Sequence, residues 1–313
     1  MALKQYVKPQ SSEWDLASIG DLRGKLVIVT GANSGIGFHT ALELGRAGAR
    51  IVVASRDPER GQDAVRRMLG QVPHARFRFE QLDLADLASV RAFATRFLER
   101  GEALDVLINN AGVMAVPTRE LTADGFERQF GTNVLGHFAL TGLLVPALRS
   151  SAAPRVVTLS SGTAYFGRID LANLQGERCY SPSFNYAQSK LANLLFMREL
   201  GRRAPWLLSV AAHPGAAHTG LQRHTGLATR ITMSFLGQDA AVGALPSLCA
   251  SAGPVVSGEF FGPSRKFNMN GPAKRVRLPK RANDVAMAHA LWKASEKLTG
   301  VIFDLAPDIR ATA

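Results

Sequence analysis

Six short apolar segments alternate with helical segments along much of the chain, and this alternation is the strongest constraint on its fold. The apolar segments, each expected to be a strand, are 25–30, 50–55, 77–82, 104–108, 155–159 and 207–212. The helices between them are expected at 35–44, from 57 onward, and at 87–98, 124–148 and 186–202. Regular alternation of this kind produces a parallel sheet covered by helices on both faces. Because crossovers in such sheets are right-handed, we predict a Rossmann-like, doubly wound α/β fold.

The chain carries no sign of a second folding unit. No proline- and glycine-rich linker divides it, and no internal repeat is present. We therefore expect one domain at 21–313, preceded by an N-terminal arm at 1–20. Within the domain, the amphipathic segment 216–237 is expected to be a lid over the substrate, and 263–313 to be a C-terminal cap.

The charge balance is strongly basic, with 37 lysines and arginines against 25 aspartates and glutamates, a net charge of +12. Most of the excess is scattered, and the one dense run is Lys274, Arg275, Arg277, Lys280 and Arg281. No aromatic side chains interleave this run, so we interpret it as a solvated rim and expect no nucleic-acid partner. The rival interpretation is a binder of nucleic acid or of an anionic membrane, whose binding would weaken steeply with salt.

Cysteine usage and the absence of targeting signals indicate the compartment. Cys179 and Cys249 form no CxxC pair, which excludes a disulfide framework and fits a reducing environment. The first residues lack the apolar core of a secretory signal, and no uninterrupted apolar segment is long enough to cross a membrane. We therefore expect a cytoplasmic protein. Its seven histidines have no metal-ligand spacing, so no metal is expected.

A glycine turn follows the first expected strand. Its sequence is Gly31-Ala-Asn-Ser-Gly35-Ile-Gly37, and a helix is expected to begin at the second glycine. Glycines allow a tight turn and a close approach of the backbone to a pyrophosphate, while the free N–H groups of the helix favour anions. A glycine turn alone is weak evidence, but this position in the first strand–turn–helix unit favours a dinucleotide site.

The end of the second strand indicates which dinucleotide. An acidic residue there would bind the ribose 2′-hydroxyl of NAD, whereas this chain has Ser55-Arg56. A guanidinium can pair with a 2′-phosphate and lie beside the adenine. We therefore predict NADP(H) as the cofactor.

A tyrosine and a lysine lie one helical turn apart at Tyr186 and Lys190. A nearby cation stabilises a phenolate and is expected to lower the pKa of the tyrosine from about 10 toward neutrality. The phenol could then exchange a proton with a substrate oxygen. Ser161, just after the fifth strand, could hold that oxygen by a hydrogen bond, and Ser160 is the neighbouring candidate.

These motifs, taken in order, resemble the short-chain dehydrogenase/reductase superfamily over about residues 22–262. The family's TGxxxGxG turn matches Thr30–Gly37, its NNAG motif matches Asn109–Gly112, and its YxxxK pair matches Tyr186 and Lys190. The resemblance implies a catalytic set of Asn133, Ser161, Tyr186 and Lys190. It implies a cofactor site of Gly31, Asn33, Ser34, Gly35, Ile36, Gly37, Ser55, Arg56, Asp83, Leu84, Asn110, Ala111, Gly112, Tyr186, Lys190, Pro214, Gly215 and Thr219.

The same resemblance implies a mechanism. NADPH gives a hydride to a carbonyl carbon, Ser161 and Tyr186 polarise the oxygen, and Tyr186 donates the proton. Lys190 lowers the tyrosine pKa and holds the nicotinamide ribose, and Asn133 holds a water that connects Lys190 to solvent. Relatives are often dimers or tetramers, so a homo-oligomer is also an expectation.

LINNAGVM, NLQGE, YAQSKLANLLF and HPG resemble the branch of retinol dehydrogenases and WW-domain oxidoreductases. The insertion between Phe166 and Phe184, which includes Tyr180, is expected to form one wall of the substrate mouth, although its aromatic side chains could equally pack the loop. The expected substrate is a hydrophobic, bulky carbonyl or alcohol of retinoid, steroid or polyketide type. The alternatives are a non-catalytic cofactor-binding protein and a double-bond reductase resembling the protochlorophyllide reductases, for which Cys179 gives no clear second proton donor.

Overall fold

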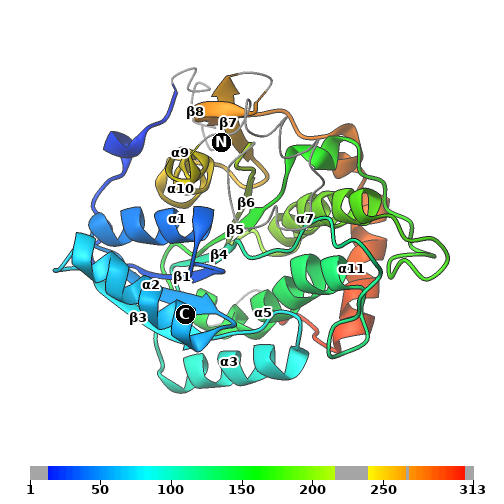
Figure 1. The fold of residues 1–313 in the computed structure, drawn as a ribbon, viewed down its shortest axis with the longest axis horizontal. Coiled ribbons are helices and arrows are strands. Elements are labelled where there is room, and N and C mark those ends of the chain that lie inside the picture. The colour runs from blue at the N-terminus through cyan, green and yellow to red at the C-terminus, as the bar shows by residue number, and fades with distance from the viewer. Residues whose placement is uncertain (1–12, 216–238, 266–267, 307–313) are drawn as a thin grey trace, which may run out of the picture.

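The computed structural model describes residues 13–215, 239–265 and 268–306, which form one mainly parallel sheet between layers of helices (Figure 1). The strands are β1 Leu26–Thr30, β2 Arg50–Ser55, β3 Arg76–Gln81, β4 Val106–Asn109, β5 Arg155–Leu159, β6 Leu208–Ala212, β7 Phe260–Arg265 and β8 Asn270–Arg275. Their order across the sheet is β3-β2-β1-β4-β5-β6-β7-β8. β8 alone runs antiparallel to its neighbour among these strands. The prediction of a single-domain, doubly wound α/β fold is confirmed.

Helices cover both faces of this sheet. They are α1 Gly35–Arg46, α2 Pro58–Gln71, α3 Leu87–Glu99, α4 Arg128–Phe130, α5 Gly136–Leu143, α6 Val145–Arg149, α7 Pro182–Arg203, α9 Ala240–Gly243, α10 Leu245–Ala252 and α11 Val285–Thr299. The shorter helical turns are η1 Leu16–Ser18, η2 Gly131–Leu135, η3 Gly162–Tyr165 and η5 Lys280–Asn283. No helix of the described residues has both the length and the apolar character needed to cross a membrane.

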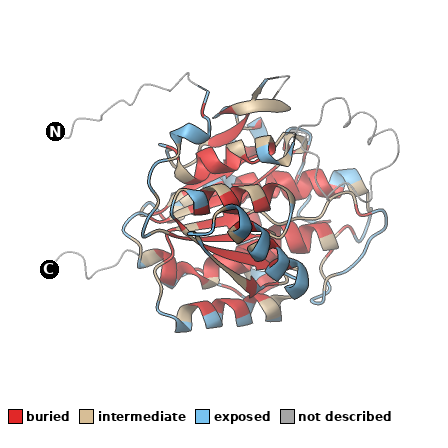
Figure 2. Ribbon diagram, turned by 60° about the vertical axis from the view of Figure 1, so that its left-hand side comes forward, coloured by how far each residue is buried: buried red, intermediate tan, exposed pale blue. Residues whose placement is uncertain are grey.

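Alternate side chains of a strand pack against helices on opposite faces of the sheet. Ile28 of β1 packs with α3, α5 and α6, whereas its neighbours Val27 and Val29 pack with α1, α2 and α10. Burial on both faces explains why the strand sequences are continuously apolar. Figure 2 shows the strands as buried ribbons inside helices whose outer faces are exposed.

Local capping explains where the helices begin. Asp57, expected as a cap, accepts a hydrogen bond from the backbone N–H of Arg60 at 3.1 Å, and Pro58 occupies the first turn. Ser181 caps α7 in the same way, so this helix begins at Pro182, four residues before the expected start at Tyr186. Asp284 caps α11, and Gly300 ends it with a φ of 64°.

The expected helix at 124–148 is wrong in detail, because the structure divides it into α4, the π-helical turn η2, α5 and α6. Pro146 in the first turn of α6 lacks the N–H that would continue α5, so the helix breaks just before it. The π turn contains Asn133 and adds one residue to a helical turn, as is common at functional sites.

β7 and β8 were not expected from the sequence. Their sequences, FFGPSR and NGPAKR, contain the glycine and proline that usually mark loops. They pair with each other, and Trp14, within the expected arm, is buried and bridges to Ala273 of β8. The segment expected as a cap therefore contributes one strand to the sheet and the helix α11.

The dense basic run follows β8 into η5. Arg275 pairs with Glu259 at 3.0 Å, and Arg281 donates a hydrogen bond to the Gly167 carbonyl at 3.0 Å. Lys274, Arg277 and Lys280 are exposed. The expected lid at 216–237 lies outside the described residues, and the limits assigned to the arm, lid and cap remain predictions.

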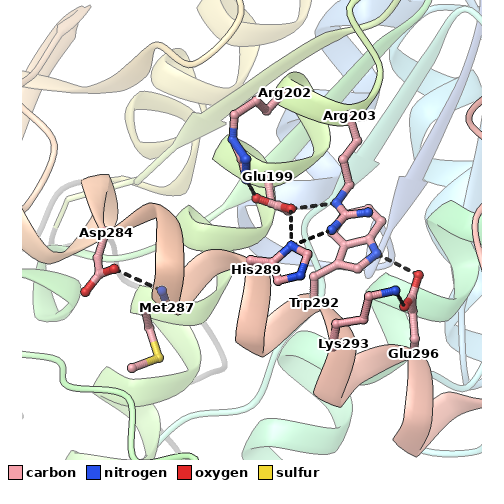
Figure 3. A network of polar contacts seen from close by, with 9 residues as sticks. All are labelled: Glu199, Arg202, Arg203, Asp284, Met287, His289, Trp292, Lys293 and Glu296. Atoms are coloured by element: carbon pink, nitrogen blue, oxygen red, sulfur yellow. Dashed lines mark hydrogen bonds and ion pairs between the residues drawn. The ribbon is translucent and has the colours of Figure 1, made fainter.

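Helix α11 packs on α7 and α5 at one side of the molecule. Four aromatic rings, Phe138, Phe196, Trp292 and Phe303, lie within 4.6–6.4 Å of one another between centroids. Beside them, a polar network around Glu199 joins the end of α7 to α11 (Figure 3).

Candidate active site

A cavity of about 520 Å³ opens at the carboxyl ends of β1, β2, β4 and β5. This edge contains the point between β1 and β4 where the strand order reverses, which is where open α/β sheets bind their ligands. The expected cofactor residues from Gly31 to Pro214 all line the cavity. Gly215 follows Pro214 outside the lining, and Thr219 lies outside the described residues.

Two glycines of the turn, Gly31 and Gly37, have no space for a side chain. A Cβ on Gly37 would lie 2.5 Å from the Asn110 Nδ2, and one on Gly31 would lie 2.9 Å from the Ala111 Cβ. Gly31 and Gly35 also have φ values of 66° and 58°, in the left-handed region that favours glycine. The backbone N–H groups that begin α1 therefore reach the cavity, and they fit a pyrophosphate.

Two arginines mark one end of the cavity. Arg56, just after β2, and Arg60, in the first turn of α2, both contribute to the lining. Arg60 also pairs with Asp57 at 3.3 Å. Beside them the Ser55 Oγ is buried and has no hydrogen-bond partner among the described residues. Arg60 was not selected from the sequence. It lies three residues after Asp57, the cap of α2, so the first helical turn brings it back toward the end of β2.

Asp83 and the NNAG segment complete the cofactor side. The Asp83 carboxylate accepts a hydrogen bond from the Ala85 N–H at 2.9 Å, which fixes the turn after β3. The Asn110 amide donates to the Thr30 carbonyl at 2.6 Å and ties the loop after β4 to the end of β1. Both contacts hold backbone at the cavity edge.

Ser161 lies near Tyr186, and its hydroxyl acts to lower the pKa of the phenol. Tyr186 is buried in α7, while Ser161 begins η3 and its hydroxyl accepts the Thr163 N–H at 3.2 Å. The Ser160 hydroxyl is directed away from this pair and donates to the Lys190 carbonyl at 2.7 Å. This geometry favours Ser161 over Ser160 as the partner of the tyrosine, although Ser160 is the one that lines the cavity.

Lys190 is a buried cation with little compensation. Its Nζ donates one long hydrogen bond, 3.4 Å, to the Leu159 carbonyl, and it lies 5.7 Å from the centre of the Tyr186 ring. An ammonium has three donors, so most of its hydrogen-bonding capacity faces the cavity. This unmet capacity fits the hydroxyl groups of a ribose.

Burial controls the ionisation of both side chains. It raises the pKa of Tyr186 to about 12, although the hydrogen bond from Ser161 opposes the shift. It lowers the pKa of Lys190 to about 8. The expected lowering of the tyrosine pKa by Lys190 is therefore wrong for this structure, because removal of the phenol from water outweighs any stabilisation of a phenolate.

Asn133 does not line the cavity. Its amide donates to the Val113 carbonyl and to the Ser189 hydroxyl, each at 3.0 Å, and accepts the Val113 N–H at 2.8 Å. A Cβ on Gly112 would lie 3.0 Å from the Asn133 Oδ1 and 3.4 Å from the Lys190 Nζ. Asn133 therefore fixes the loop after β4 beside Lys190.

The aromatic residues of the 166–184 insertion do not line the cavity. Tyr180 packs the loop, because its hydroxyl donates to the Val116 carbonyl at 2.6 Å and accepts from Gln129 at 3.2 Å. Phe166 is 83% exposed and Phe184 37% exposed. Cys179 is exposed and outside the lining too.

The apolar part of the cavity wall comes from other segments. Val113, Met114 and Val116 follow β4, and Leu159 ends β5. Sequence reasoning did not select them, because isolated apolar residues in a loop carry no distinctive signal. They give part of the cavity wall a hydrophobic surface.

The sequence and fold are similar to those of known proteins. A family model described as short chain dehydrogenase matches residues 25–227. Retinol dehydrogenase 12 of Mus musculus is 41% identical over 89% of this chain and 87% of its own length. Polyprenol dehydrogenase of Mus musculus is 43% identical over 88% and 84%. A solved structure of an uncharacterized protein from Mycobacterium paratuberculosis is 44% identical, with a TM-score of 0.79 over 94% of this chain and 100% of that one.

Proposed function

The chain belongs to the short-chain dehydrogenase/reductase family, in its retinol dehydrogenase-like branch, and on that premise we propose that it is an NADP(H)-dependent carbonyl reductase with Tyr186 as its proton donor. The family consists of oxidoreductases that use a nicotinamide cofactor. The direction, the NADP(H) preference and the roles of individual residues are our proposals.

One observation carries the assignment. Tyr186 and the ammonium of Lys190 line the same cavity as the glycine turn, and Ser161 lies near Tyr186. Among the described residues, Lys190 has one long hydrogen bond, which leaves most of its donors unmet. Buried ionisable groups with unmet hydrogen bonds are costly to a fold unless a ligand completes them. A non-catalytic protein would have no need for that arrangement.

The two arginines support NADP(H) over NAD(H). Arg56 and Arg60 put two positive charges at the end of the cavity where Ser55 replaces the acidic residue typical of NAD sites. A 2′-phosphate between two guanidinium groups would form charge-assisted hydrogen bonds that a 2′-hydroxyl cannot.

The chemistry follows from the protonation state of the tyrosine. When bound, the nicotinamide dinucleotide supplies the hydride that reduces the carbonyl carbon. Ser161 and Tyr186 donate hydrogen bonds to the carbonyl oxygen, and the Tyr186 proton moves to that oxygen as its negative charge develops. With its pKa raised to about 12, the phenol is protonated at neutral pH and can serve as the proton donor in reduction.

Substrate class follows from the cavity wall and from relatives. Met114, Val116 and Leu159 present apolar surface beside the reacting groups. The similar mouse proteins are named for retinol and polyprenol, both long hydrophobic alcohols. We propose a bulky hydrophobic aldehyde or ketone, of retinoid, isoprenoid, steroid or polyketide type, with the matching alcohol as product.

The test is a panel of hydrophobic carbonyls followed by the absorbance of NADPH, with Tyr186→Phe as the matched variant. We expect turnover with NADPH well above turnover with NADH. The variant should bind NADPH normally and lose about 10³-fold in turnover, since it keeps the ring and loses the proton. Near-normal activity of the variant would contradict the role of Tyr186, and equal use of both cofactors would contradict that of the arginines.

A further inference from the structure

A buried histidine contacts both the end of β1, where the glycine turn begins, and the π turn that contains Asn133. His137 in α5 is 2% exposed and does not line the cavity. Its Nε2 lies 2.9 Å from the Thr30 Oγ1, at the end of β1 where the glycine turn begins. Its Nδ1 lies 3.1 Å from the carbonyl oxygen of Asn133, in the π turn that adjoins Lys190.

The partners of the ring determine its tautomer. A carbonyl oxygen only accepts hydrogen bonds, so the Nδ1 that faces Asn133 must carry a proton. Burial and nearby Lys190 lower the pKa of His137 to about 4, so the ring is neutral near pH 7. The Nε2 of a neutral ring protonated on Nδ1 is an acceptor, and Thr30 must be its donor.

Both lone pairs and the proton of the Thr30 hydroxyl then take part in hydrogen bonds. The hydroxyl accepts the backbone N–H groups of Asn110 at 2.9 Å and Ala111 at 3.0 Å, which use both lone pairs. Its single proton has two acceptors within reach, the His137 Nε2 at 2.9 Å and the Ile108 carbonyl at 3.3 Å. The shorter contact is to the histidine, so the ring sets the direction in which Thr30 presents its lone pairs.

We propose that His137 is a positioning residue that couples cofactor binding to catalysis. Its Nε2 holds Thr30, and through Thr30 the loop of Asn110 and Ala111, while its Nδ1–H holds the π turn of Asn133 beside Lys190. This inference rests on the proposed function for its kinetic part. The assignment of the tautomer and the effect on cofactor binding do not depend on any turnover.

Two variants separate the two bonds. In His137→Asn the side-chain nitrogen can occupy the place of Nδ1 and donate to Asn133, but nothing reaches Thr30. In His137→Gln the side-chain oxygen can occupy the place of Nε2 and accept from Thr30, but nothing reaches the Asn133 carbonyl. His137→Phe keeps a ring of similar size and loses both bonds.

The expected results differ in kind. His137→Asn should weaken NADPH binding about tenfold, with kcat within about threefold of the wild type. His137→Gln should lower kcat about tenfold and leave NADPH affinity within about threefold. His137→Phe should show both losses. NADPH affinity is measured by fluorescence titration in the absence of substrate, so it is interpretable even if the proposed reaction were wrong.

A purely structural role would give a different pattern. All three variants would then melt earlier but retain the wild-type NADPH affinity and kcat below their melting temperatures, and that result would overturn the proposal. Equal losses of both quantities in the Asn and Gln variants would also overturn it. If the variants fail to fold, ¹⁵N NMR of the histidine rings in the wild-type protein decides: a proton on Nε2 at pH 7 contradicts the proposal, and one on Nδ1 supports it.

Discussion

Helix α7 buries a charge at two positions, in opposite ways. In the first half of the helix, Lys190 is 5% exposed and has one hydrogen bond, of 3.4 Å, among the described residues. Near its end, Glu199 is 1% exposed and contacts three cationic or titratable partners: Arg202, Arg203 with its Nε at 2.6 Å, and His289 with its Nδ1 at 3.7 Å (Figure 3).

The contrast distinguishes a structural charge from a chemical one. The carboxylate of Glu199 pairs with Arg202 and Arg203 of the same helix, and its contact with His289 reaches α11. No carboxylate of the described residues pairs with the ammonium of Lys190, so a ligand that accepts its hydrogen bonds is expected to stabilise the fold. Removal of the Lys190 charge should therefore raise stability and lower activity. Removal of the Glu199 charge should lower stability and leave activity unchanged.

The largest effect is expected for Lys190→Met. Turnover should fall about 10³-fold, because the residue that holds the ribose and supports proton transfer is lost. Stability should rise, by at most about 3 kcal/mol at pH 7, because a lysine whose pKa is lowered to about 8 opposes folding wherever it is charged. Urea unfolding and steady-state kinetics measure both, with the exposed Lys280→Met as control. A destabilised variant would contradict the view that this charge is uncompensated.

Glu199→Gln should do the reverse. We expect a loss of about 2 kcal/mol in the free energy of unfolding, because the buried carboxylate loses its pairing with Arg202 and Arg203 of its own helix and weakens its contact with His289 of α11, while the arginines keep access to water. Turnover per folded molecule should not change. Asp63→Asn, which removes an exposed i,i+3 pair with Arg66, is the control and should cost less than about 0.5 kcal/mol. A drop in kcat without loss of stability would show that Glu199 and the active site are coupled.

A third prediction concerns pH. Reduction needs the protonated phenol of Tyr186, whereas alcohol oxidation needs the phenolate. With a raised pKa of about 12, the phenolate fraction grows about tenfold per pH unit across the neutral and mildly alkaline range. The rate of oxidation should therefore rise with pH from 7 to 9, while reduction should not rise. A plateau of oxidation below pH 8 would mean that Lys190 does lower the tyrosine pKa when the site is loaded.

Local sequence signals predicted much of the fold. β2 and β5 have the expected bounds, and Asp57 caps its helix as expected, because β-branched runs and capping residues act over a few positions. The π turn at Asn133 and the strands β7 and β8 were missed. Their geometry comes from packing against the rest of the sheet, which no short window of sequence contains.

The site divides in the same way. The order of Gly31, Tyr186 and Lys190 along the chain identified the family chemistry, because the spacing of a turn and of one helix face is local. The sequence could not predict that burial would raise the tyrosine pKa, that Ser161 rather than Ser160 would face it, or that Arg60 would join Arg56. Those depend on how far each group is removed from water and on which elements meet around it.

By itself, therefore, the sequence determined the alternation of strands and helices, the glycine turn and the residue types available for chemistry. Only the tertiary structure decided which buried charges are compensated, as for Glu199, and which are left for a ligand, as for Lys190. The reason is physical: backbone propensity and residue spacing are properties of neighbours in the chain, whereas desolvation and hydrogen-bond satisfaction depend on groups that only the fold brings together.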